Sequence, residues 1–237
     1  KDQETWYYLD KDGIMLTGNQ DINGVRYYLN ASGAMQTGWA FVDGHWNYFA
    51  SSGAMKTGWV KDQETWYYLD KDGIMLTGRQ DINGVRYYLN ASGAMQTGWK
   101  WQENSWYFYT NSGAMKTGWL KDKESWYYLD PETGIMAVGS KEIDGKNYFF
   151  SSAGTMQVGW QWSNDSWHYY ATSGALQTGW LKDGDVWYYL EGKEGVMLVG
   201  LHQVDGKQYY FSKSGAMQTG WKWFDNHYRY FESNGAM

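Results

Sequence analysis

The stretch QDINGVRYYL, residues 20–29, places an Asn-Gly pair between two short segments of alternating apolar and polar residues. Asn23 and Gly24 suit the central positions of a type I′ turn, because both positions need a positive φ that asparagine and glycine tolerate best. Alternation with a period of two is typical of a half-buried strand. The stretch therefore predicts a β-hairpin with a two-residue turn.

The hairpin pattern recurs about every twenty residues along the whole chain. All 11 methionines take the same place in this repeat, from Met15 to Met237, and Leu176 takes the remaining place. A hairpin of this length cannot bury an apolar face alone, so neighbouring repeats must stack. We expect about twelve repeats, which end near Gly18, Gly38, Gly58, Gly78, Gly98, Gly118, Gly139, Gly159, Gly179, Gly200, Gly220 and Met237.

The composition excludes several classes of protein. The 237 residues include 30 glycines, one proline and no cysteine, so there is no disulfide framework and no thiolate metal site. The net charge of −6 disfavours nucleic-acid binding, and no apolar run is long enough for membrane insertion. Because the chain begins partway through a repeat, we expect a piece of a longer protein whose signal segment is not included.

Period two divides the side chains of each hairpin between two faces. Trp59 and Trp66 lie seven residues apart across the turn and share one face, either directly opposite or offset by one cross-strand pair, and a two-residue turn favours the offset. Tyr68, two residues after the second tryptophan, lies on that same face. Leu69 lies on the other face, where we expect the equivalent residues and the methionines to form the interior.

The tryptophan pairs follow a three-repeat cycle, in which two repeats carry a pair and the third carries none. The pairs are Trp39/Trp46, Trp59/Trp66, Trp99/Trp106, Trp119/Trp126, Trp160/Trp167 and Trp180/Trp187. In the third repeat, polar residues such as Arg79 and Arg86 take both places. Because these polar repeats recur regularly, we expect the tryptophan face to be at least partly open to solvent, with Asp21 and Arg26 as cross-strand partners.

Two tryptophans on an open face, closed by an aromatic residue of the next repeat, would form an aromatic box. A quaternary ammonium ion suits such a box, because it has no N–H groups to satisfy and each ring face attracts it by roughly 0.5–2 kcal/mol. Alternatively, the aromatic residues only hold the hairpins together. Four further aromatic residues, which we expect to pack rather than contact a ligand, follow the first tryptophan position by two residues: Phe41, Trp101, Trp162 and Trp223.

The units GWVKDQETWYYLDKDGIMLTG and GWKWQENSWYFYTNSGAMKTG resemble choline-binding repeats, the cell-wall-binding modules of surface proteins and murein hydrolases from Gram-positive bacteria and their phages. The resemblance covers residues 1–237. It implies an all-β fold, a left-handed β-solenoid of stacked hairpins. It also implies a non-catalytic, extracellular and cell-wall-associated module without a cofactor, which binds choline or phosphocholine of teichoic acids. Some relatives form homodimers through their terminal repeats, and this remains open here.

Carried over position by position, the family pattern gives six choline-binding boxes between consecutive repeats. They are Trp39, Trp46 and Tyr68; Trp59, Trp66 and Tyr88; Trp99, Trp106 and Tyr128; Trp119, Trp126 and Phe149; Trp160, Trp167 and Tyr189; and Trp180, Trp187 and Tyr210. The third residue of each box rests on the period-two argument, with the neighbouring aromatic residue as the alternative. Junctions led by polar repeats are expected to hold no choline, and Trp6 and Trp221 lack a complete box.

Three other functions remain to be compared. IDGKNYFF and VDGKQYYF resemble glucan-binding and clostridial-toxin repeats, but a dextran-binding module would use tryptophan as a flat platform rather than in pairs. An enzyme is poorly supported, because the four histidines fall at unrelated places in the repeat and no nucleophile motif accompanies them. The DKDG segments at Asp10 and Asp70 lack the rest of a calcium loop and are predicted to be turns, so no metal is expected. A purely structural spacer is the last alternative.

Overall fold

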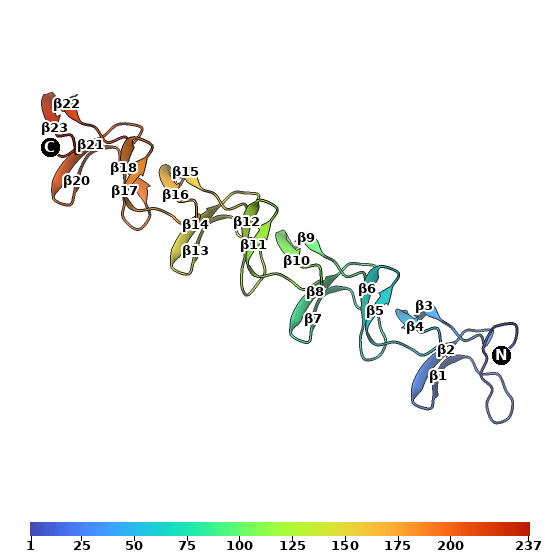
Figure 1. The fold of residues 1–237 in the computed structure, drawn as a ribbon. Helices are drawn as coiled ribbons and strands as arrows, with labels where there is room; N and C mark the ends of the chain where they lie inside the picture. The colour runs from blue at the N-terminus through green and yellow to red at the C-terminus, as the bar shows by residue number, and fades with distance from the viewer. The chain divides into compact units, whose positions relative to one another are not determined.

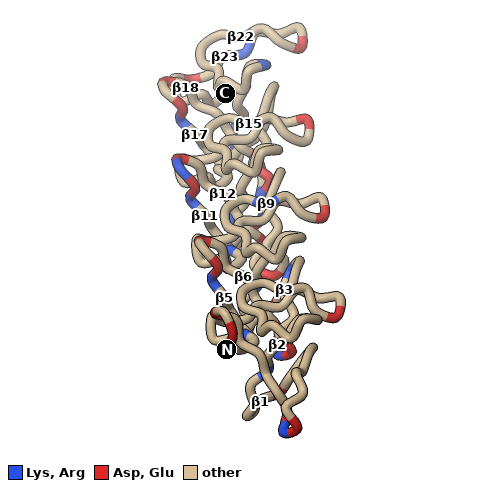
Figure 2. The backbone as a smooth tube through the Cα atoms, turned by 90° about the vertical axis from the view of Figure 1, so that its right-hand side faces the viewer, with Lys and Arg blue, Asp and Glu red and all other residues tan.

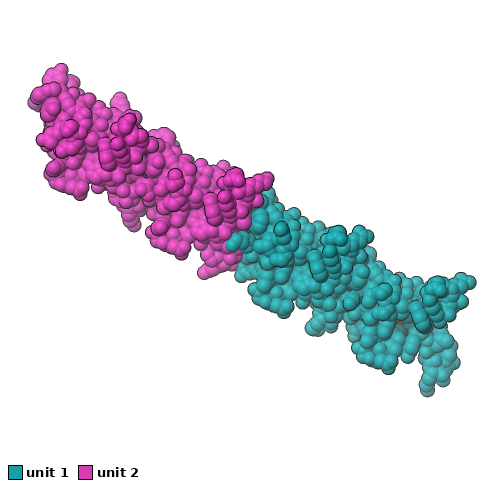
Figure 3. All heavy atoms as spheres, viewed as in Figure 1, with its two compact units in different colours: residues 1–116 teal, residues 117–237 magenta.

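The computed structural model describes residues 1–237, which form β-hairpins and no helix (Figure 1). No segment of the structure is therefore a membrane-spanning helix. The chain divides into two compact units, residues 1–116 and 117–237 (Figure 3). The predicted all-β fold of hairpin repeats is confirmed.

Each unit consists of successive two-stranded hairpins. In residues 1–116 they are β1–β2 (Gly18–Ile22, Val25–Leu29), β3–β4 (Gly38–Val42, His45–Phe49), β5–β6 (Gly58–Asp62, Thr65–Leu69), β7–β8 (Gly78–Ile82, Val85–Leu89) and β9–β10 (Gly98–Gln102, Ser105–Tyr109). In residues 117–237 they are β11–β12 (Gly118–Asp122, Ser125–Leu129), β13–β14 (Gly139–Ile143, Lys146–Phe150), β15–β16 (Gly159–Ser163, Ser166–Tyr170), β17–β18 (Gly179–Asp183, Val186–Glu191), β20–β21 (Gly200–Val204, Lys207–Phe211) and β22–β23 (Gly220–Phe224, His227–Phe231). The short strand β19 (Val196–Met197) pairs with β18.

The turns have the predicted geometry. Asn23 and Gly24 have φ values of 52° and 79°, and Ile22 pairs with Val25 on either side of them. In the equivalent hairpin β5–β6, Trp59 pairs with Tyr68 and Lys61 pairs with Trp66. The two tryptophans therefore share a face and are offset by one cross-strand pair, as predicted.

The interior is formed by the hairpin face that lies opposite the tryptophans. The residue three places after the second tryptophan position is almost fully buried in every hairpin, with Leu69 0% and Phe49 1% exposed. The largest fully buried side chains all belong to this position: Tyr109, Phe49, Phe150, Phe211, Phe231, Leu29, Leu69, Leu89, Leu129 and Leu190. This part of the predicted interior is confirmed from β1–β2 onward, whereas the equivalent Leu9 of the first repeat is 54% exposed.

Within each unit, consecutive hairpins are joined through the main chain at most methionine positions. The N–H of Met75 donates to the carbonyl oxygen of Trp46 in the preceding hairpin at 2.8 Å, and the N–H of Met55 donates to that of Arg26 at 2.8 Å. Because the bond uses only the backbone, it forms whether the second position holds tryptophan or arginine. Gly93 is required beside Met75, since a Cβ at this glycine would lie 2.3 Å from the methionine sulfur.

The polar hairpins also keep aromatic contacts with the hairpin that follows. Tyr88 stacks on the buried Tyr109 with ring centroids 6.1 Å apart, and Phe149 stacks on Tyr170 at 6.0 Å. Within the first polar hairpin, Asp21 and Arg26 are cross-strand partners and form an ion pair of 3.3 Å, as predicted. The polar repeats therefore stack by ring contacts that do not need tryptophan.

The predicted turn at Asp70 is also confirmed. Its carboxylate accepts the main-chain N–H groups of Asp72 and Ile74, each at 2.9 Å. An aspartate that bonds to the backbone in this way is a local turn former.

Candidate binding site

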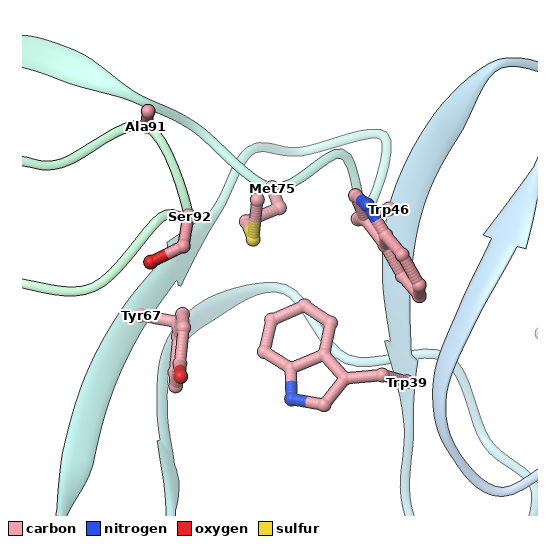
Figure 4. Close-up of a pocket in the computed structure, with 6 residues that line it drawn as sticks. All are labelled: Trp39, Trp46, Tyr67, Met75, Ala91 and Ser92. Atoms are coloured by element: carbon pink, nitrogen blue, oxygen red, sulfur yellow. The ribbon is translucent and has the colours of Figure 1, made fainter.

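One pocket of the first unit lies between Trp39, Trp46, Tyr67 and Met75 (Figure 4). The two indoles come from β3 and β4, the tyrosine comes from β6, and the methionine follows β6. Small side chains of the next connection, including Ser92, line the remaining side. The cavity of about 350 Å³ is open to solvent and large enough for a small ligand.

The rings of the pocket stand steeply inclined to one another. Trp39 and Tyr67 have centroids 4.7 Å apart at an interplanar angle of 68°. In the next pocket, Trp59 and Trp66 are 6.3 Å apart at 89°. Steeply inclined faces enclose a compact group on several sides and offer no extended flat surface.

The same pocket recurs in both units. Its complete lining by two tryptophans, a tyrosine and a methionine is found at Trp39, Trp46, Tyr67 and Met75; at Trp59, Trp66, Tyr87 and Met95; and at Trp119, Trp126, Tyr148 and Met156. Two further sets keep the contact between the first tryptophan and the tyrosine at 4.8 Å, namely Trp160 with Tyr188 and Trp180 with Tyr209. Trp99 and Trp106 lie 6.5 Å apart at the end of the first unit, and their closing residue stays a prediction.

The residue that completes each described pocket lies one position earlier than the sequence predicts. The rings are those of Tyr67, Tyr87, Tyr148, Tyr188 and Tyr209, in place of Tyr68, Tyr88, Phe149, Tyr189 and Tyr210. The physical reason is that the tryptophan face of one hairpin meets the opposite face of the next hairpin. The closing side chain therefore has the parity of the buried leucine and not that of the tryptophans.

The residues predicted to close the boxes have another place. Tyr68 pairs across the strands with Trp59 of its own hairpin, with ring centroids 5.1 Å apart, and Tyr128 and Tyr189 contact Trp119 and Trp180 in the same way. In the polar hairpins, Tyr88, Phe149 and Tyr210 stack on the core residues of the following hairpin instead. None of these side chains lines a pocket described above.

The methionines belong to the interior, as predicted, and some of them also line pockets. Met156 packs against the buried Ile143 and Phe150 and is a wall of a pocket as well. Met75, Met95 and Met156 each line a pocket, and each is held by a neighbouring glycine and by the main-chain bond to the preceding hairpin. The recurring Gly-x-Met spacing is the sequence signal for this wall, because it fixes a polarizable thioether at one point of every repeat.

The first tryptophan of the pocket is held in two different ways. The indole N–H of Trp39 donates to the carboxylate of Asp62 at 3.0 Å, and that of Trp160 donates to Asp183 at 2.9 Å. At the position of these aspartates, the hairpins after Trp59, Trp119 and Trp180 carry buried aliphatic residues: Ile82, Ile143 and Val204. Pockets with and without a nearby negative charge therefore alternate along the chain.

The polar hairpins fill their own junctions with protein side chains. The Arg79 guanidinium lies over the Tyr107 ring, 4.3 Å from its centroid, where the equivalent tyrosines close a pocket. It also donates to Gln102 at 3.0 Å and forms an ion pair with Glu103 at 3.2 Å. In the first polar junction, Asn19 donates to Asp43 at 2.9 Å. These places are occupied by polar side chains of the chain itself.

A buried histidine takes the tyrosine position after the polar hairpin β13–β14. His168 is 6% exposed and lies 3.3 Å from the Ser163 hydroxyl, and its burial lowers the pKa of the imidazole. Burial likewise raises the pKa of the Tyr170 phenol, which is hydrogen-bonded to Ser140. Neutral side chains therefore fill this junction.

A further pocket lies beside Trp6, for which the sequence predicts only an incomplete box. Trp6, Tyr27 and Met35 line a cavity of about 320 Å³ with Ser51 and Ser52, without a first tryptophan. Trp221 and Tyr228, by contrast, remain 67% and 68% exposed.

Comparisons with known proteins agree with this geometry. The family model described as choline-binding repeat matches residues 16–57, 36–77, 56–98, 76–116, 96–140, 137–177, 157–200 and 198–237, and a putative cell wall binding repeat matches residues 1–15. The chain belongs to the choline-binding repeat family. It is a choline-binding repeat module, in which the paired tryptophans occupy the pocket positions described above. No curated protein sequence matches it.

Solved structures of choline-binding proteins share the fold. CbpJ from Streptococcus pneumoniae superposes with a TM-score of 0.77 at 27% identity, over 98% of this chain and 99% of that one. Choline binding protein F of the same organism gives 0.73 at 29% identity, over 100% and 96%. The choline-binding domain of CbpL from Streptococcus pneumoniae gives 0.59 at 28% identity, over 77% and 97%.

Proposed function

We propose that residues 1–237 form one non-catalytic module that anchors an attached protein to the cell wall by binding choline at several pockets at once. Its partners are the choline or phosphocholine groups of teichoic and lipoteichoic acids, outside the cell. The observation that carries the proposal is the recurrence of one pocket, with two tryptophans, a tyrosine and a methionine, in both units.

The pocket suits a quaternary ammonium group better than a sugar ring. Its walls are aromatic faces and a thioether, so a cation without N–H groups loses no hydrogen bonds on entering. Each ring face contributes roughly 0.5–2 kcal/mol of cation–π attraction. The angles of 65° and 89° that Trp59 makes with Tyr87 and Trp66 favour a compact group over a flat pyranose.

The choline-binding residues that we propose include the tyrosine and the methionine of each pocket. The sets are Trp39, Trp46, Tyr67 and Met75; Trp59, Trp66, Tyr87 and Met95; Trp119, Trp126, Tyr148 and Met156; Trp160, Trp167, Tyr188 and Met197; and Trp180, Trp187, Tyr209 and Met217. Trp99 and Trp106 contribute to a sixth pocket. The backbone bonds at the methionine positions join consecutive hairpins within each unit. We extend this to a left-handed β-solenoid of about twelve repeats, the arrangement that the family resemblance implies.

Several pockets on one chain act together on a polymer that carries many cholines. A single pocket binds free choline weakly, with a Kd on the order of 1 mM, or about −4 kcal/mol. Once one choline is bound, the others are presented at a high effective concentration, which raises the affinity for the polymer by about 10²–10⁴. Free choline in excess should therefore release the module from the wall.

Tryptophan fluorescence during titration tests the proposal, with choline and dextran as the two probes. We expect a saturable change with choline and none with dextran, and a smaller change in the Trp66→Ala variant. A Lys61→Ala variant is a control, because Lys61 faces Trp66 across the strands without lining the pocket. A response to dextran alone would replace choline binding by glucan binding, and no response to either would leave a structural spacer.

A further inference from the structure

Four aromatic side chains outside the pockets are exposed at the same place in every third repeat. Phe41, Trp101, Trp162 and Trp223 are 60%, 57%, 55% and 58% exposed. The sequence predicts that they pack, and each one contacts the ring that faces it across its own hairpin while more than half of its surface stays exposed. Phe41 lies 5.4 Å from Trp46, and Trp101 and Trp162 each lie 5.5 Å from Trp106 and Trp167. Their outer faces are left to solvent.

The position is occupied by a different kind of residue in each of the three classes of hairpin. It is aromatic in β3–β4, β9–β10, β15–β16 and β22–β23, lysine in β5–β6, β11–β12 and β17–β18, and acidic or amide in the polar hairpins. An aromatic ring is thus not needed to build the hairpin, because Lys61 and Asp81 take the same position in hairpins of the same length. The exposed ring has another use.

The Phe41 ring is continuous with a pocket. Trp46 is a wall of the pocket with Trp39 and Tyr67, and Phe41 contacts the same indole at its edge. Phe41 is therefore an exposed aromatic surface beside one wall of this pocket.

The surroundings of these rings select among possible occupants. The two turn residues beside each ring are polar, as in Glu103-Asn104 and Asn164-Asp165, and acidic residues lie at the tips of these hairpins (Figure 2). Hydrogen-bonding groups around an isolated aromatic face suit a hydroxylated ring. Two hairpins without an aromatic residue at this position separate one such ring from the next along the chain, so they do not offer the continuous apolar area that a protein interface needs.

We propose that Phe41, Trp101 and Trp162 are stacking platforms for a sugar ring of the polymer that carries the choline. The inference rests on the proposed function and adds a second subsite to it. The C–H bonds of one pyranose face carry partial positive charge, and they lie against the negative face of the aromatic ring. Choline enters the pocket, the phosphodiester leads out of it, and the adjoining sugar lies on the platform.

Binding of a one-repeat fragment of phosphocholine-bearing teichoic acid, compared with binding of choline chloride, tests this subsite. The variant is Phe41→Ala/Trp101→Ala/Trp162→Ala, and the readout is the ratio of the two dissociation constants, which cancels any loosening of Trp46. We expect the ratio of the fragment's Kd to the Kd of choline to be about threefold to tenfold higher in the variant than in the wild type. The Trp101→Phe/Trp162→Phe variant should keep the wild-type ratio, because phenylalanine already serves at position 41.

A second measurement uses the same fragment after removal of its choline. Saturation-transfer NMR should detect contact between the protein and the sugar-ring protons in the wild type, and this signal should vanish in the triple alanine variant. An unchanged ratio together with no transfer to the sugar protons would overturn the platform. Failure of the wild type to bind choline chloride would overturn the proposed function instead, so the two failures are distinguishable.

Discussion

A single shift of one residue separates a pocket wall from a supporting side chain. Tyr87 faces the preceding hairpin and closes the pocket of Trp59 and Trp66, whereas Tyr88 faces the following hairpin and stacks on Tyr109. The two tyrosines are adjacent in β8 and point to opposite faces. They therefore offer a matched pair of substitutions with opposite consequences.

Tyr87→Leu should remove one choline site with little effect on stability, because it deletes a wall of the pocket and leaves the core ring pair intact. Tyr88→Leu should lower the free energy of unfolding by about 1–2 kcal/mol and leave the number of choline sites unchanged, because it deletes the stack on Tyr109. Calorimetric titration counts the sites, and denaturant unfolding measures the stability. Loss of a choline site in the Tyr88 variant but not in the Tyr87 variant would mean that Tyr88 closes the pocket of Trp59 and Trp66, as the sequence predicts.

The aspartate behind the first tryptophan should tune the affinity of its pocket. Asp183→Asn keeps an acceptor for the indole N–H of Trp160 but removes the negative charge. We expect choline to bind this pocket about twofold to fivefold more weakly, with a smaller difference at high salt, because the carboxylate is exposed to solvent. Titration of a variant in which only this pocket keeps its tryptophans isolates the effect. An equal loss at low and high salt would contradict an electrostatic role.

The sequence predicts the elements of the site better than the way they meet. Asn23-Gly24 fixes the turn, and the turn fixes the face and offset of Trp59 and Trp66. Period two cannot say which faces of two hairpins come together, and this is why Tyr68 is predicted in place of Tyr67. The bond from Trp39 to Asp62 spans 23 residues and two repeats, and no local pattern predicts it.

At the scale of the hairpin, polar side chains of the chain itself occupy the junction that follows a polar repeat. The Arg79 guanidinium over Tyr107 stands in the place where a ligand cation would meet the closing tyrosine. Met115 is also in position, since its N–H donates to the Arg86 carbonyl at 2.7 Å. The tyrosine and the methionine of a pocket are thus present between β7–β8 and β9–β10, and the two tryptophans are absent.

Arg79→Trp/Arg86→Trp should therefore create a new choline site. The substitution removes the internal cation and supplies two ring faces beside Tyr107, each of which attracts choline by roughly 0.5–2 kcal/mol. The number of bound cholines per chain should rise by one in calorimetric titration. Arg86→Trp alone is the control, because Arg79 still lies over Tyr107. A folded double variant with the wild-type count would show that further contacts decide this junction.

The junction at His168 should make stability depend on pH. Burial lowers the pKa of His168, so the native state holds the neutral imidazole while the unfolded chain takes up a proton near pH 6.5. The contribution of this group is complete above the unfolded pKa and is lost as the pH falls below it toward the folded pKa. His168→Asn, which copies the buried Asn47 of the first polar junction, should reduce the fall in Tm between about pH 7 and pH 5. An identical pH profile in both proteins would contradict this assignment.

At the scale of the whole chain, the repeating unit is a group of three hairpins with two pockets and one filled junction. Residues 1–39 and 61–99 are identical except for Asn19 and Arg79. Deletion of residues 40–99 therefore joins Trp39 to Lys100 in a sequence context that the chain already contains. It removes one group of three hairpins without creating a new junction.

The deletion variant should keep four of the six tryptophan pairs and bind four cholines in place of six, with an unchanged Kd for free choline. Its affinity for choline-bearing teichoic acid should fall by a larger factor, about tenfold or more, because each lost pocket also removes a tethered binding event at high effective concentration. Titration with choline gives the first quantity, and the choline concentration that releases the module from cell walls reports the second. A fall in wall affinity by only the ratio of site numbers would mean that the pockets bind independently. The repeats would then raise the number of cholines bound without a multivalent gain in affinity.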